Sequence, residues 1–364
     1  MRASTGREHA ASKRGNTQAE SNARCVRAAG FGHASLNYYG CRMRNRKLGR
    51  TGFEVSELGY GAWGIGGKQW QGGTDDESIR ALHRAIELGL NFIDTALAYG
   101  GGHSERLVGG VLRETKQRIY VATKVPPKNQ LWPARPGISI DKVFPYDYIM
   151  RCTEKSLRNL QVETIDLQQL HVWNSEWIND DDWRRAFEDL KKSGKVRAVG
   201  VSINDHQPDS AIELINTDLI DTVQVIYNVF DQTPEQSLFP VAREKNIGVI
   251  ARVPFDEGSL TGAIKEDTVF EPDEFRSFYF RGDRKKEVVT HVLELQKEIE
   301  GLEDTLASVA LRFCLSDPAV STVIPGMRRV RNVEVNVAAV DKGPLDGLLK
   351  QKLKRHAWVK NYYS

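Results

Sequence analysis

The feature that most constrains the fold is a regular alternation of short β-rich runs with amphipathic helical runs, which begins at Ser56. The β-rich runs at residues 119–125, 196–202 and 248–253 are nearly continuous in apolar and β-branched residues. Such strands are typical of parallel sheets covered by helices on both faces. Repeated strand–helix units indicate an α/β fold, and both a closed barrel and an open sheet fit the pattern. We expect eight strands, at residues 56–61, 91–95, 119–125, 164–171, 196–202, 222–227, 248–253 and 320–324.

Gly59, Gly61 and Gly64 have the GxGxxG spacing of a dinucleotide-binding fingerprint. That fingerprint requires a helix that opens at the third glycine, so that its N-terminus holds a pyrophosphate. Here more glycines follow, and helical periodicity starts only after Asp75. We therefore interpret the motif as a strand followed by a glycine-rich loop, and not as the start of a Rossmann domain.

The first 42 residues differ from the rest of the chain. They carry seven Lys or Arg against two acids, are rich in Ala, Ser, Gly and Asn, and show no sustained apolar periodicity. A segment of this composition does not bury enough apolar surface to fold alone. We predict a division into residues 1–42 and a barrel domain at 43–364. Three interpretations of residues 1–42 stay open: a translation start placed ahead of Met43, a disordered leader, or a targeting peptide.

Bulk properties exclude several classes of protein. No run approaches the roughly 18 apolar residues of a membrane span, and a net charge of +3 gives no reason to expect a nucleic-acid partner. The cysteines show neither a CxxC motif nor metal-like spacing, which indicates a reducing, cytoplasmic location without disulfides or a metal site. The sequence does not specify an oligomeric state. The cysteines are Cys25, Cys41, Cys152 and Cys314.

Residues 254–304 form the least regular part of the repeating region, with several glycines and aromatic residues among charges. A loop this long after the predicted seventh strand is expected to serve as a lid or a binding element. Residues 285–299 within it have helical periodicity. Residues 345–357 predict a basic amphipathic helix that either closes against the barrel or stays solvated.

Four polar side chains fall at or just after the ends of successive predicted strands. Asp94 ends the second strand, Tyr99 follows it by five residues, Lys124 comes near the end of the third, and His171 ends the fourth. Each alone has a structural explanation: a helix cap, a loop aromatic, an exposed strand end and a buried histidine. In a parallel barrel, however, the C-terminal ends of neighbouring strands meet at one mouth, where active sites are built. Together, these four side chains therefore predict an active site at the barrel mouth.

With these motifs in this order, the chain resembles the aldo-keto reductase superfamily from about Met43 to its C-terminus. The matching segments surround Trp63, Asp94 to Tyr99, Lys124, His171, Ser202, Gln224 and Gly326. The resemblance implies a (β/α)8 TIM barrel with a long loop after the seventh strand and a C-terminal helix. It also implies an NADP(H)-dependent oxidoreductase that interconverts a small aldehyde or ketone and an alcohol.

The residue types suit that chemistry. A tyrosine hydroxyl has an ordinary pKa of about 10, which is far from neutral. An adjacent ammonium lowers such a pKa, and a carboxylate keeps the ammonium charged. By resemblance, Tyr99 is the proton donor, Lys124 tunes it, Asp94 anchors Lys124, and His171 orients the carbonyl oxygen. Trp63 and Trp132 are expected to wall the substrate pocket.

The resemblance also assigns cofactor-binding residues. Ser202 and Gln224 are expected to bind the nicotinamide carboxamide, with Asn204 displaced by one position from the usual asparagine. Arg252 stands where an aromatic usually stacks on the nicotinamide, so it is either a stacking guanidinium or a structural ion-pair partner. A segment with Phe255, Gly258 and Leu260 matches the pyrophosphate loop. The adenosine end is expected at Gly326, Arg328, Asn332 and Asn336, where Arg328, Arg329 and Arg331 favour a 2′-phosphate and hence NADP over NAD.

Two other functions stay open: an NAD-dependent sugar or pyridoxal-type dehydrogenase, and a non-catalytic cofactor-binding regulatory subunit. The intact set of Asp94, Tyr99, Lys124 and His171 favours an enzyme over the regulatory subunit. The sequence does not name the substrate.

Overall fold

The computed structural model describes residues 43–67, 69, 70 and 72–360, so residues 1–42 lie outside the described part. Its centre is a parallel sheet of eight strands in which each strand pairs with the next along the chain. Parallel bridges from Leu58 to Val323 and from Gly61 to Gly326 join the first strand to the last and close the barrel. The predicted barrel is confirmed. The strands are β3 (Tyr60–Gly61), β4 (Phe92–Asp94), β5 (Tyr120–Val125), β6 (Ile165–Leu170), β7 (Val196–Ser202), β8 (Thr222–Ile226), β9 (Gly248–Arg252) and β10 (Val320–Val323).

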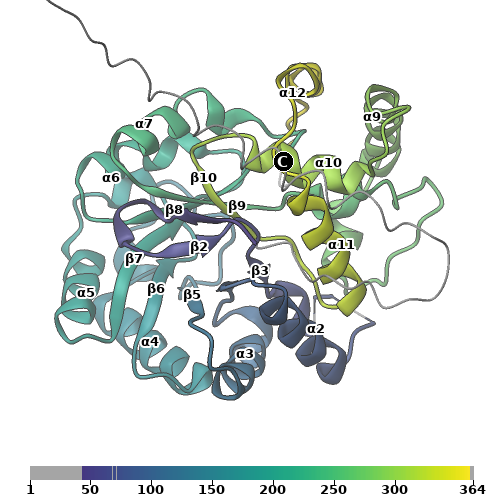
Figure 1. The fold of residues 1–364 in the computed structure, drawn as a ribbon. Coiled ribbons are helices and arrows are strands. Elements are labelled where there is room, and N and C mark those ends of the chain that lie inside the picture. Colours follow the sequence, from purple (N-terminus) through teal and green to yellow (C-terminus); the bar gives the residue numbers. More distant parts are fainter. Residues whose placement is uncertain (1–42, 68, 71, 361–364) are drawn as a thin grey trace, which may run out of the picture. The chain divides into compact units, whose positions relative to one another are not determined.

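Helices surround this barrel because each has one apolar face, which packs on the outside of the strands (Figure 1). Capping residues mark where some of these helices begin. The Thr74 side chain accepts a hydrogen bond from the backbone N–H of Glu77, and the Asp180 side chain accepts one from the backbone N–H of Asp182 at the start of α5 (Asp181–Lys192). The surrounding helices are α2 (Asp75–Glu87), α3 (His103–Glu114), α4 (Tyr146–Leu160), α5 (Asp181–Lys192), α6 (Ile212–Asn216), α7 (Leu238–Glu244), α10 (Leu306–Leu315) and α11 (Val330–Asp341).

An antiparallel hairpin of β1 (Asn45–Lys47) and β2 (Glu54–Ser56) precedes the barrel and lies across one of its ends (Figure 1). The prediction of one strand over residues 56–61 is therefore wrong at its start, because Ser56 belongs to the hairpin and only Tyr60–Gly61 joins the barrel. The hairpin's Leu48, Phe53 and Val55 pack against inward side chains of the barrel. Together they form one buried cluster, whose other members are Phe92, Ala122, Leu167, Ala198, Ile250 and Ile324.

This apolar layer fixes where the polar residues point. Side chains alternate between the two faces of a strand, so residues two or four positions further along also face the barrel interior. The residues two or four positions after the barrel members of this buried cluster are Asp94, Lys124, Gln169, Ser202 and Arg252. All five therefore face inward, at or near the C-terminal ends of their strands. The polar side chains at the barrel mouth therefore follow from the two-residue alternation of side chains along a β-strand.

The predicted loop after the seventh barrel strand holds three short or medium elements: η8 (Asp256–Thr261), α8 (Phe275–Tyr279) and α9 (Arg284–Glu298). The last of these confirms the expected helix near residues 285–299. The C-terminal helix is α12 (Gly347–Lys354), which contacts α9. The loop reaches the opposite side of the barrel mouth, where the backbone N–H of Phe275 donates to the Gln69 carbonyl over 3.1 Å.

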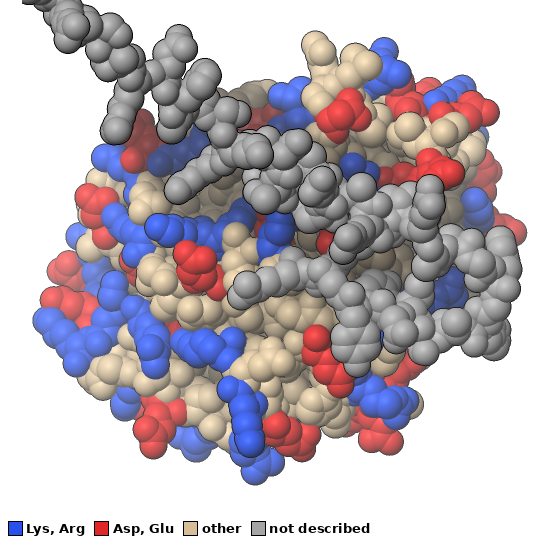
Figure 2. Space-filling model, in the orientation of Figure 1, with Lys and Arg blue, Asp and Glu red and all other residues tan. Residues whose placement is uncertain are grey.

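Acidic and basic side chains are interspersed over the part of the surface that the described residues form in Figure 2. No helix among the described residues is long and apolar enough to cross a bilayer. Cys152 and Cys314 are both buried free thiols, whereas Cys25 and Cys41 lie outside the described residues.

Candidate active site

The structure brings the four predicted side chains together at one mouth of the barrel. Asp94 ends β4, Lys124 is the penultimate residue of β5, His171 directly follows β6, and Tyr99 begins a 3-10 turn in the loop after β4. Lys124 Nζ lies 2.6 Å from Asp94 Oδ2 and 3.4 Å from the Tyr99 hydroxyl. These contacts form a continuous chain from carboxylate to ammonium to phenol.

Lys124 is fully buried, and a buried ammonium is stable only when all of its donors find partners. Its third donor meets the Thr95 carbonyl oxygen over 2.8 Å, which completes the set. Asp94 is only 2% exposed, and its other oxygen accepts a hydrogen bond of 2.8 Å from Gln224 Nε2. Gln224 thus fixes the carboxylate from the far side of the barrel.

Burial and neighbouring charges set the protonation states of Lys124 and Tyr99. Burial by itself lowers the pKa of Lys124, but Asp94 and Tyr99 outweigh it and leave that pKa above its ordinary value. Burial raises the pKa of Tyr99. The Lys124 ammonium lowers the pKa of Tyr99, but this effect is smaller than that of burial, so the net shift is upward. Tyr99 carries its proton at neutral pH.

His171 lies beside Tyr99, with ring centroids 5.6 Å apart in an edge-to-face arrangement. Burial, together with the positive Lys124 and Arg252, holds the pKa of His171 well below its ordinary value. The imidazole is therefore neutral at pH 7. Its buried Nδ1 has no hydrogen-bond partner among the described residues.

Aromatic rings wall the space next to Tyr99 and His171. Trp132 packs edge-on against His171 at 4.5 Å, and Trp63 lies 6.3 Å from Tyr99, so both predicted pocket residues border the site. Two further rings were not predicted: Trp70 and Phe275 lie 5.5 and 4.9 Å from Trp63. Phe275 comes from the long loop, whose aromatic content was visible in the sequence but whose contact with Trp63 was not.

The residues expected near the nicotinamide occupy the ends of β7, β8 and β9. Ser202 is buried at the end of β7. Asn204 exchanges two hydrogen bonds of 3.1 Å with the backbone of Ala134, so it ties the loop after β7 to the loop after β5. Arg252 forms an ion pair with Asp205 and donates to the Ile203 carbonyl over 3.0 Å. These contacts favour the structural ion-pair interpretation of Arg252.

The predicted pyrophosphate segment is the tight turn η8 after β9. Leu260 is fully buried and Phe255 is partly buried, and both pack on the main core. Gly258 has a φ of 107°, a conformation that residues with a Cβ rarely adopt.

The residues expected at the adenosine end lie around the start of α11. Gly326 and Asn332 are exposed and Asn336 is buried. Arg328 is half-buried, and its Nη1 has no hydrogen-bond partner among the described residues. Burial lowers the pKa of Arg328, as do the neighbouring Arg329 and Arg276. An unpartnered guanidinium nitrogen beside other cations suits an anionic ligand.

A buried phenol that is hydrogen-bonded to an ammonium, next to a neutral imidazole, can polarise an oxygen atom and give it a proton. Among the described residues, no three His, Cys, Asp or Glu side chains are placed to hold a metal ion.

Comparisons with known proteins agree with this arrangement. A sequence model of the Aldo/keto reductase family matches residues 57–352. The chain is 32% identical over 306 residues to the aldo-keto reductase YhdN of Bacillus subtilis (strain 168), with 80% of this chain and 87% of that protein covered. It is 28% identical over 313 residues to the NADH-specific methylglyoxal reductase of Escherichia coli (strain K12), with 82% and 94% covered.

Solved structures show the same fold. The holo form of the aldo-keto reductase AKR11C1 from Bacillus halodurans superposes with a TM-score of 0.70 at 27% identity and covers 89% of this chain and 100% of its own. The glycerol dehydrogenase AKR11B4 from Gluconobacter oxydans gives a TM-score of 0.71 at 30% identity, with 86% and 94% covered. From the match over residues 57–352 and these relatives, the chain belongs to the aldo/keto reductase family of oxidoreductases.

Proposed function

We propose that this chain is an NADP(H)-dependent oxidoreductase that interconverts a small aldehyde or ketone and the corresponding alcohol, with Tyr99 as the proton donor. The observation that carries the proposal is the contact chain from Asp94 through Lys124 to the Tyr99 hydroxyl, buried beside His171. The set is intact, which favours an enzyme over a regulatory subunit.

In the direction of reduction, a bound nicotinamide would supply the hydride that the carbonyl carbon receives. The carbonyl oxygen then needs a proton, which the Tyr99 hydroxyl gives up. The Lys124 ammonium stabilises the phenolate that remains, and Asp94 keeps Lys124 in place. His171 is neutral and carries one N–H, which orients the carbonyl oxygen and stabilises its developing charge. Oxidation of the alcohol runs through the same residues in reverse.

Several features fit an NADP cofactor. Arg328 offers an unpartnered, partly buried nitrogen near the start of α11, and Arg329 and Arg331 lie beside it in the sequence. Three closely spaced arginines at a helix start suit a 2′-phosphate. The alternative is NAD, since one relative is named as NADH-specific. Ser202, Gln224, Phe255, Gly258 and Leu260 remain the proposed contacts to the rest of the cofactor.

Steady-state oxidation of NADPH and of NADH by the full chain, over a panel of aliphatic, aromatic and sugar aldehydes, tests the function. We expect aldehyde-dependent turnover with NADPH. Absence of turnover on every aldehyde with both nucleotides, and on the matching alcohols with the oxidised forms, would contradict the proposal.

Arg328→Ala tests the cofactor, with Arg113→Ala as a control that removes an exposed arginine from the last turn of α3. A hydrogen bond between charged groups contributes about 1.5–3 kcal/mol, so we expect the Kd for NADPH to rise about 10- to 100-fold while that for NADH stays nearly constant. Equal weakening of both nucleotides would show that Arg328 does not recognise the 2′-phosphate.

A further inference from the structure

The C-terminal segment that follows α12, residues 355–360, joins two parts of the structure that lie far apart in the sequence. The backbone N–H of Trp358 donates to the Phe230 carbonyl over 2.8 Å, and the two rings meet edge-on at 5.5 Å. The Trp358 ring also stacks on His291, with centroids 4.1 Å apart. The segment therefore fastens α9, which carries His291, to the loop after β8, which carries Phe230.

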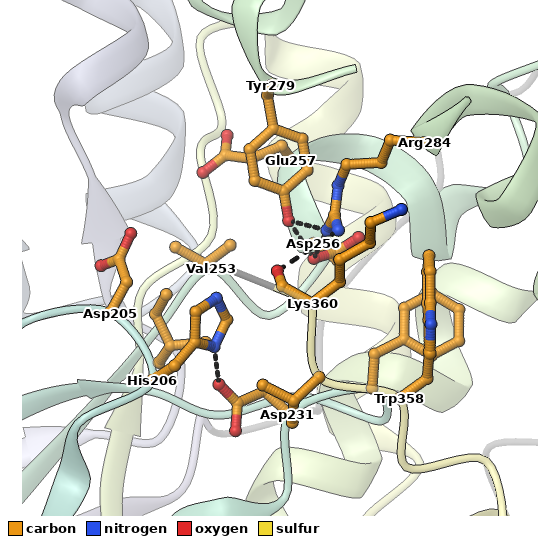
Figure 3. Close-up of a pocket in the computed structure, with 13 residues that line it drawn as sticks. Asp205, His206, Asp231, Val253, Asp256, Glu257, Tyr279, Arg284, Trp358 and Lys360 are labelled. Atoms are coloured by element: carbon orange, nitrogen blue, oxygen red, sulfur yellow. Dashed lines mark hydrogen bonds and ion pairs between the residues drawn. The ribbon is translucent and has the colours of Figure 1, made fainter. Parts of the chain in front are cut away.

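Arg284 begins α9 and lies where this segment meets the long loop after β9 (Figure 3). It is only 5% exposed. Its guanidinium carbon lies 4.3 Å from the Tyr279 ring centroid and 5.3 Å from that of Trp358, both within cation–π range. Nη1 donates to the Lys360 carbonyl over 3.4 Å, whereas Nη2 donates to the Tyr279 hydroxyl and lies 3.4 Å from Asp256 Oδ1. Arg284 thus contacts turn η8, α8 and the C-terminal segment at once.

The contacts of Arg284 make the long loop depend on the C-terminal segment. A buried guanidinium is stable only when its charge and its donors are matched. Asp256 supplies the opposite charge, and the Trp358 ring and the Lys360 carbonyl add contacts from the C-terminal segment. Without the Trp358 ring, water would reach the guanidinium, and an ion pair exposed to water contributes little to stability. The anchoring of the long loop at Arg284 would weaken with it.

Arg284 is connected to the candidate active site through α8. Tyr279 ends this helix and Phe275 begins it, and their rings lie 6.0 Å apart. Tyr279 is 3% exposed, and its hydroxyl contacts both Arg284 and Asp256. Phe275 instead contacts the pocket wall, with its ring 4.9 Å from Trp63. A helix of five residues is too short to be stable alone, so the contacts at its two ends fix its position.

We propose that Arg284 and Trp358 are positioning residues for the substrate pocket. The C-terminal segment holds Arg284, and Arg284 holds Tyr279 at one end of α8. The other end of α8 then places Phe275 against Trp63. The inference rests on the proposed function, and it adds two residues that influence substrate affinity through their contacts with α8.

The test is the KM for benzaldehyde at saturating NADPH, measured with the full chain. If Trp358 acts through Phe275, Trp358→Ala should raise this KM about 2- to 10-fold, as expected for Phe275→Ala, with a smaller change in kcat. The double variant should then have a KM within about twofold of that of Phe275→Ala, because two changes in one series of contacts do not add. Partial unfolding would instead lower kcat through the active fraction and leave the KM unchanged.

Two further variants serve as controls. Trp358→Phe keeps an aromatic ring beside Arg284, so its KM should lie within about twofold of the wild type. Leu348→Ala removes a side chain that is 67% exposed on α12 and should follow the wild type.

A second readout needs no substrate. Arg281 is exposed between α8 and α9, and trypsin cleaves after it when this segment opens locally. Trp358→Ala should raise the rate of this cleavage about fivefold or more, whereas cleavage after the exposed Lys116, between α3 and β5, should stay constant.

A KM in Trp358→Ala within about twofold of the wild type, or effects of Trp358→Ala and Phe275→Ala that multiply in the double variant, overturns the inference. Unchanged cleavage after Arg281 overturns it as well. Each of these results leaves the proposed function standing. A wild-type chain that turns over neither benzaldehyde nor any other aldehyde contradicts the proposed function instead.

Discussion

Replacing Lys124 with methionine removes the ammonium of the contact chain while keeping a side chain of similar length. Asp94 is 2% exposed, and in this variant the Gln224 amide would be the remaining side-chain hydrogen-bond donor to its carboxylate among the described residues. Removing one partner of a buried ion pair leaves an uncompensated buried charge and costs about 3–5 kcal/mol. We expect Lys124→Met to lower the free energy of unfolding by about that amount, which is a large part of the stability of an ordinary domain.

Urea unfolding followed by circular dichroism measures this loss as a shift of the midpoint at constant slope. The matched control is the double variant Asp94→Asn/Lys124→Met, which removes both charges and should recover much of the loss, because a neutral amide costs far less to bury than a carboxylate. A loss below about 1 kcal/mol in Lys124→Met would match an exposed ion pair and would refute the reasoning that the pair is desolvated.

Three other predictions test the barrel, the histidine and the pocket wall. A Cβ at Gly200 would lie 2.2 Å from Thr222 Oγ1 and 2.6 Å from the Thr222 carbonyl, so Gly200→Ala should lower the free energy of unfolding by about 1–3 kcal/mol or more in thermal melts. Gly110→Ala on α3 meets nothing within 4 Å, should stabilise slightly, and serves as its control. Because the pKa of His171 is lowered in the folded chain, the unfolded chain binds more protons below about pH 6.5, and stability falls as the pH drops through that value by at most about 1.4 kcal/mol per pH unit. His171→Asn should reduce this slope, and an unchanged slope would mean that His171 is charged when folded. Phe275→Ala should raise the KM for an aromatic aldehyde about 2- to 10-fold, whereas Phe278→Ala, which removes a partly exposed ring from the same helix, should not.

Much of the barrel could be predicted because its strands are buried on both faces. The β-branched runs of β5, β7 and β9 have nearly the predicted bounds, and inward side chains follow from a period of two. The hairpin was missed since β1 reads Asn45–Lys47, a short polar run without apolar alternation. Ser56 was then assigned to the wrong strand, because the hairpin and the first barrel strand follow each other closely.

The candidate site was predictable where position along a strand decides it, and not where distant segments meet. Asp94, Lys124 and His171 lie at or next to the C-terminal ends of their strands, so topology alone places them at one mouth. The partner of Arg252 and the contact of Phe275 with Trp63 depend on how loops fold over that mouth, which no local pattern encodes. The direction of the Tyr99 pKa shift depends on burial, which the sequence does not give.

The central claim is that the Tyr99 hydroxyl gives its proton to the substrate oxygen. Tyr99→Phe removes only that hydroxyl and leaves the Lys124–Asp94 pair intact. With saturating NADPH and the best aldehyde, we expect kcat to fall by about 10²- to 10⁴-fold, while the Kd of the nucleotide stays unchanged. A variant that keeps kcat within about twofold of the wild type would contradict the claim.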